Sequence, residues 1–195
     1  MTTGFIAALL LIFFLRIAYR RFTRFRNRTE EDVASYLLPI DLGELTGLVD
    51  KLTEEIMWHE LEPRDLREVQ MNRMRLLQNY IRWMRHNADV LQEWGEYSYN
   101  RRRFAEEDGI KSCSLDLIKA CRNFRFGARA IQLDLHIKFI KLKLFPSKPV
   151  PRLSRIRRID ASFDLLFAYQ SIRLAAEYLS QAYGDDCYEC LAEIL

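Results

Sequence analysis

Apolar residues follow two patterns along this chain: one unbroken run near the N-terminus and helical periodicity from about residue 30 onward. In the second part, apolar positions recur at spacings of three, four and seven residues, which is typical of helices that bury one face in a bundle. Only seven glycines and five prolines interrupt the 195 residues. The pattern predicts an all-α protein with a single N-terminal transmembrane helix followed by a helical-bundle domain of about five helices.

Capping residues and helix breakers predict where these helices begin and end. Thr29, Asp41 and Ser112 or Ser114 can accept hydrogen bonds at helix N-termini, and Pro63 suits the first turn of a helix. The predicted helices cover residues 29–38, 41–61, 64–104, 112–145 and 153–183, with a last short helix after Gly184.

Residues 131–139 carry two conflicting signals. Apolar and polar residues alternate strictly there, which is typical of a strand, whereas the helical spacing continues on both sides. A lone strand would have no partner to pair with, so we expect a helix. Apolar residues would then surround that helix, which implies either deep burial or a second contact surface.

The N-terminal run, Gly4 to Leu15, is apolar all round and continues past Arg16 to Tyr19. As a helix, residues 1–19 span about 28 Å, close to the ~30 Å hydrocarbon core of a bilayer. A cleaved signal peptide would need positive charge before the run, and an interfacial helix would need a polar face. A membrane-spanning anchor fits better than either alternative, or than a helix buried in a soluble core.

Positive charge is concentrated just after this run. Six of the 30 basic residues lie within residues 1–28, which contain no acid, so the rest of the chain has 24 basic against 27 acidic residues. Because positive residues stay on the cytoplasmic side, we expect the N-terminus outside and the body in the cytoplasm. The six can also contact anionic lipid: Arg16, Arg20, Arg21, Arg24, Arg26 and Arg28.

The predicted organisation is therefore a transmembrane anchor (1–19), a basic juxtamembrane stem (20–28) and a cytoplasmic helical domain (29–195). Three prolines suggest a linker at 146–152. A second basic stretch runs from Lys138 to Arg158 without an acid. It is solvated, or faces acids within the domain, or lies against anionic lipid through Arg155, Arg157 and Arg158. The mildly acidic body argues against nucleic acid as a partner.

Catalytic motifs are not evident in the sequence. Cys187 and Cys190 form a C-x-x-C, the one candidate for a metal or redox site, but neither a second chelating pair nor a βαβ context accompanies it. Buried free thiols are the simpler interpretation for these two residues and for Cys113 and Cys121. The three histidines lie on different predicted helices without the spacing of a di-iron site.

These observations favour a non-enzymatic, membrane-anchored scaffold or regulator that binds a protein partner and needs no cofactor. Two alternatives stay open. The first is an enzyme with an unusual, metal-dependent site in the bundle, and the second is a peripheral module that binds a lipid surface through its basic residues.

Overall fold

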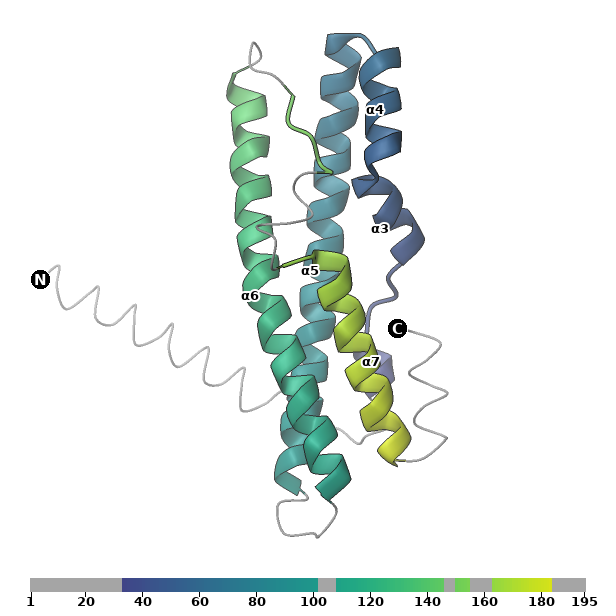
Figure 1. The fold of residues 1–195 in the computed structure, drawn as a ribbon. Coiled ribbons are helices and arrows are strands. Elements are labelled where there is room, and N and C mark those ends of the chain that lie inside the picture. The colour runs from purple at the N-terminus through teal and green to yellow at the C-terminus, as the bar shows by residue number, and fades with distance from the viewer. Residues whose placement is uncertain (1–32, 102–107, 146–149, 155–162, 184–195) are drawn as a thin grey trace, which may run out of the picture.

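A computed structural model describes residues 33–101, 108–145, 150–154 and 163–183 of the chain. Within these ranges the secondary structure is helical and contains no β-strand, which confirms the predicted all-α bundle. The helices are α2 (Val33–Tyr36), α3 (Leu42–Val49), α4 (Lys51–Glu60), α5 (Pro63–Arg101), α6 (Asp108–Leu144) and α7 (Leu165–Tyr183) (Figure 1).

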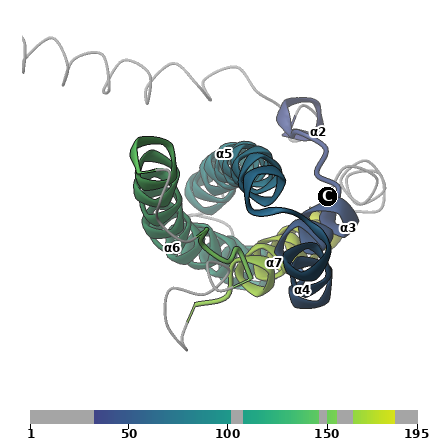
Figure 2. The ribbon, with the colours of Figure 1, turned by 90° about the horizontal axis from the view of Figure 1, so that it is seen from above.

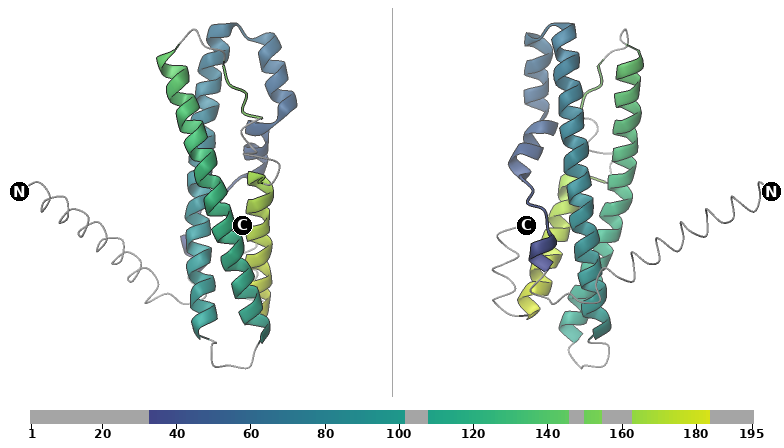
Figure 3. Two further views of the ribbon diagram at one scale, coloured as in Figure 1. Left: turned by 60° about the vertical axis from the view of Figure 1, so that its left-hand side comes forward. Right: turned by 180° about the vertical axis from the view of Figure 1, so that it is seen from behind.

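The two longest helices, α5 and α6, run antiparallel along each other and form the axis of the molecule (Figures 1 and 3). Helix α7 packs on the N-terminal half of α6, while α3 and α4 follow α5 on the other side (Figure 2). All the shorter helices therefore attach to one antiparallel pair.

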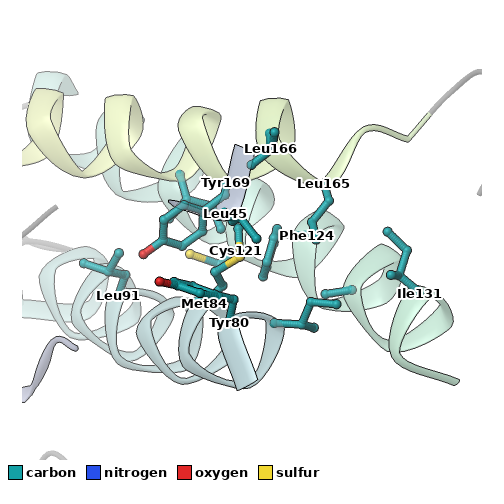
Figure 4. Close-up of a cluster of buried hydrophobic side chains, with 14 of the residues drawn as sticks. Leu45, Tyr80, Met84, Leu91, Cys121, Phe124, Ile131, Leu165, Leu166 and Tyr169 are labelled. Atoms are coloured by element: carbon teal, nitrogen blue, oxygen red, sulfur yellow. The ribbon is translucent and has the colours of Figure 1, made fainter. Parts of the chain in front are cut away.

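The core fills the space between α5, α6 and α7. Trp94, Phe124 and Tyr169 are its largest fully buried side chains, one from each of these helices. The Phe124 and Tyr169 rings lie 5.6 Å apart between centroids, which joins α6 to α7. Figure 4 shows the apolar side chains that surround them, including Tyr80, Met84, Leu91, Cys121, Ile131 and Leu165.

Two glycines allow close packing against α6. A β-carbon on Gly95 of α5 would lie 3.2 Å from Ile118 Cγ1 and 3.3 Å from the Ser114 carbonyl oxygen, so α5 and α6 approach closely there. A β-carbon on Gly127 of α6 would overlap the ring of Phe163. The absence of a side chain at Gly127 therefore leaves room for the half-buried ring of Phe163, which lies just before α7 begins.

The helix predicted over 41–61 is in fact two helices, so that prediction is wrong. Asp50 has an extended backbone and separates α3 from α4, and its carboxylate accepts hydrogen bonds from Thr53 N at 2.7 Å and Thr53 Oγ1 at 2.8 Å. This local cap competes with the apolar periodicity that continues through it. The predicted cap at Asp41 is confirmed, because its side chain accepts from Glu44 N at 2.9 Å.

Two other predicted helix starts are wrong. Ser112 and Ser114 both lie inside α6, which begins at Asp108, so neither caps it. The Ser114 hydroxyl instead donates to the Ile110 carbonyl oxygen at 2.7 Å. Leu153 is not helical, and α7 begins at Leu165, where Asp164 Oδ1 accepts from Leu166 N at 3.0 Å. The helix expected through 131–139 is confirmed as part of α6.

None of the helices that the structure describes is long and apolar enough to cross a membrane. The segment predicted to do so, residues 1–19, lies outside the described residues.

The packing of Phe163 predicts the effect of a small substitution. Gly127→Ala should lower the free energy of unfolding by about 1–3 kcal/mol, because the added methyl group displaces the ring. Urea unfolding followed by circular dichroism measures this change.

Gly109→Ala is the matched control, since a β-carbon there meets nothing within 4 Å. It should be neutral or slightly stabilising, as expected for alanine replacing glycine in a helix. In a Phe163→Ala background, Gly127→Ala should lose its cost, and an unchanged cost would contradict the proposed overlap.

Candidate functional site

Most of the residues singled out by the sequence lie outside the part of the chain that the structure describes. These are Arg16, Arg20, Arg21, Arg24, Arg26, Arg28, Arg155, Arg157, Arg158, Cys187 and Cys190. Their predicted contacts with lipid, partner or metal therefore stay predictions.

The other two cysteines are separate thiols on α6. Cys113 is half-buried and Cys121 is buried, and neither forms a disulfide. Burial raises the pKa of the Cys121 thiol well above its usual range, so this group stays protonated and behaves as a small apolar side chain. Among the described residues, no group of three or more His, Cys, Asp or Glu side chains could hold a metal ion.

A buried carboxylate connects α4 to the segment that follows α6. Glu54 is only 1% exposed. It accepts hydrogen bonds from Leu153 N at 2.5 Å, Ser154 Oγ at 2.5 Å, Ser154 N at 3.1 Å and Gln70 Nε2 at 2.7 Å. Burial raises the pKa of Glu54, but these donors outweigh it and hold the pKa below the ordinary value of 4.5. The carboxylate is therefore charged and fully used within the fold.

Arg73 of α5 extends the same cluster to α3. Its guanidinium donates to the Leu48 carbonyl oxygen at 2.7 Å and to the Gly47 carbonyl oxygen at 3.3 Å, both at the C-terminal end of α3. A cation is favoured there by the unpaired carbonyl groups and the helix dipole. Burial lowers the pKa of Arg73, while the nearby charges of Glu54 and Asp50 raise it. This cluster holds α3, α4 and residues 150–154 against α5.

The buried side-chain amide of Asn87 joins α5 to the segment after α2 and to α7. Asn87 donates to the Leu38 carbonyl oxygen and accepts from Leu38 N, each at 2.8 Å, and donates to the Tyr169 hydroxyl at 3.0 Å. Burial raises the pKa of Tyr169 to about 12. The phenol is thus a neutral structural partner, and the amide positions the segment after α2 and the start of α7.

Polar residues also line one edge of the α5–α6 interface. Arg125 pairs with Asp89 at 2.9 Å and donates to Gln92 Oε1 at 2.7 Å, and Arg85 donates to Gln132 Oε1 at 2.5 Å. These contacts fix the register of the two long helices. Like the two buried clusters, they have the character of structural connections.

The longest exposed apolar row among the described residues is a stripe on the outer side of α6, defined by Phe126, Ala130, Leu133, Ile137, Ile140 and Leu144. All six residues are exposed. Phe126 is 80%, Leu133 63% and Leu144 65% exposed. At about 100° per residue, this outer stripe lies opposite the buried stripe that contains Phe124, Ile131 and Leu135. Helix α6 thus carries two apolar faces.

The outer stripe resolves the conflict seen in the sequence. Alternation over 131–139 arises because residues two apart lie on nearly opposite sides of a helix. Ile131 and Leu135 are buried on one face, and Leu133 and Ile137 are exposed on the other. The sequence left deep burial and a second contact surface as alternatives, and the full extent of the exposed row was missed. The signal was the 4-3-4-3-4 spacing from Phe126 to Leu144.

Comparisons of this chain with family models, with curated proteins and with solved structures found no match.

The Glu54 cluster predicts a pH-dependent contribution to stability. Glu54→Gln should lower the free energy of unfolding at pH 7 by roughly 1–3 kcal/mol, because an amide nitrogen would face the donors of Leu153 and Ser154. A lowered carboxyl pKa stabilises the fold above the unfolded value and loses that effect as the pH falls through the folded value. The difference between wild type and variant should therefore shrink below about pH 4.5.

Urea unfolding at several pH values measures this difference. Glu60→Gln, at an exposed position of the same helix, is the control and should change little. A difference for Glu54→Gln that stays constant from pH 7 to pH 3 would show that the charge of this carboxylate does not matter.

Proposed function

We propose that this protein is a non-enzymatic, membrane-anchored scaffold or regulator that recruits a partner protein through the outer stripe of α6. The observation that carries the proposal is the stripe itself. Five large apolar side chains, 42–80% exposed and aligned over several helical turns, are more typical of a binding surface than of scattered surface residues. The buried polar clusters support it, because their groups are used to hold the helices together.

Membrane attachment in this proposal rests on the apolar run within residues 1–19 and the six arginines that follow it. With the body on the cytoplasmic side, as positive flanking charge favours, the protein would hold its partner at the inner face of the membrane.

Substitution within the apolar run tests the anchor. The full chain should stay with membranes after an alkaline carbonate wash. The double variant Leu10→Arg, Leu11→Arg should be released, since each arginine near the centre of a span costs roughly 2.5–3.5 kcal/mol on insertion scales. Arg16→Lys, which keeps the flanking charge, should behave as wild type. Equal retention of all three forms would argue against a membrane span.

Substitution within the outer stripe tests recruitment. Leu133→Gln, Ile137→Gln should reduce the recovery of co-purifying protein from detergent-solubilised membranes by about tenfold or more, because two apolar contacts are lost. Thermal unfolding should be nearly unchanged, since both positions are exposed in the isolated chain.

The matched control is Leu174→Gln, Tyr178→Gln on α7, where the side chains are 52% and 61% exposed. This variant should keep the partner. If both double variants recovered the same proteins as wild type, the stripe would not be the recruiting surface.

A further inference from the structure

The spacing of the outer stripe points to a helix as its occupant. The spacing between its six successive residues alternates between four and three positions, which is the repeat of a coiled-coil seam. The stripe covers about 27 Å along α6. Around the helix they spread over only about 80°, narrower than the apolar face of a typical amphipathic helix. A row this narrow fits the groove of one neighbouring helix.

The charges beside the stripe define the chemistry of that helix. From Arg122 to Lys143, α6 contains six basic residues and one acid. The acid, Asp134, is already paired with Lys138 at 2.6 Å, and Arg125 is paired with Asp89 at 2.9 Å. Exposed basic side chains flank the apolar row at Arg129, Lys141 and Lys143. Two of them, Arg129 and Lys141, stand about 60° to either side of its centre line.

Charge and shape disfavour two other occupants. A second copy packed through the same stripe would bring two basic flanks together, which is repulsive in either orientation. A lipid surface suits the positive charge, but an interfacial helix presents a broad apolar face to the membrane, and charged residues border this row closely on both sides.

We propose that the outer stripe binds one amphipathic helix of a partner protein, with acidic residues flanking its apolar seam, packed along α6 as in a two-stranded coiled coil. The inference rests on the proposed recruiting function and specifies the partner. Acidic flanks on that helix would meet Arg129 on one side and Lys141 on the other, which favours this partner over a neutral or basic helix.

Site-specific photo-crosslinking in the full-length protein, within the membranes of cells that make it, tests this partner class. A photoreactive residue at Leu133 should crosslink to another protein, at a segment with heptad apolar spacing and acidic flanking positions. The same residue at Leu174 on the exposed side of α7 is the matched control and should not label that segment.

Charge reversal supplies the second readout. Arg129→Glu, Lys141→Glu should reduce the Leu133 crosslink about fivefold or more and leave thermal unfolding unchanged, since both residues are exposed. In the purified full chain, a 21-residue peptide with leucine at the a and d positions and glutamate at e and g should bind more tightly than its lysine counterpart. The preference should reverse in the charge-reversed variant.

The outcomes separate the two proposals. Crosslinks to a protein segment that is basic or not helical would overturn the acidic-helix inference and leave recruitment intact. Crosslinks from Leu133 to lipid, or to a second copy of this chain, would overturn both proposals, as would the absence of any crosslinked protein. Equal binding of the two peptides would also overturn the inference, because flanking charge would then have no role.

Discussion

Antiparallel packing of α5 against α6 is the constraint on which the rest of this structure depends. Neither α3, α4 nor α7 could bury its apolar face without a surface supplied by these two helices. The pair is brought close at Gly95, where a side chain would press on Ile118 and the Ser114 backbone, and is kept in register by the Arg125–Asp89 ion pair. The length of this pair makes the described part of the chain elongated (Figure 3).

The short elements are held to this pair largely by buried polar groups. Asn87 satisfies both backbone groups of Leu38 and reaches Tyr169, so one amide on α5 positions segments from both sides of the sequence. Glu54 accepts hydrogen bonds from the backbone nitrogens of Leu153 and Ser154 and so holds that segment against α4. Because an unpaired polar group in such a place costs free energy, each cluster specifies one arrangement rather than merely adding stability.

The proposed recruiting function uses the face of α6 that the described helices leave uncovered. Helix α6 uses one face to build the core and presents the opposite face, from Phe126 to Leu144, to the outside. Packing of the buried face holds α6 in place, so the backbone that carries the exposed side chains keeps a constant spacing. In the proposed complex, this apolar row and its basic flanks would select the shape and the charge of the partner helix.

The sequence by itself determined the helical class, the long helices and several of their ends, because periodicity and caps such as Asp41 act over a few neighbouring residues. The predicted helix bounds were wrong at Asp50, where a local cap interrupts a continuous apolar pattern. They were also wrong at the start of α7, which was expected at Leu153 but begins after the cap at Asp164. Only the tertiary structure decided which of the two apolar faces of α6 is buried. That choice depends on where α5 and α7 pack, and contacts between residues distant in the chain leave no local signal.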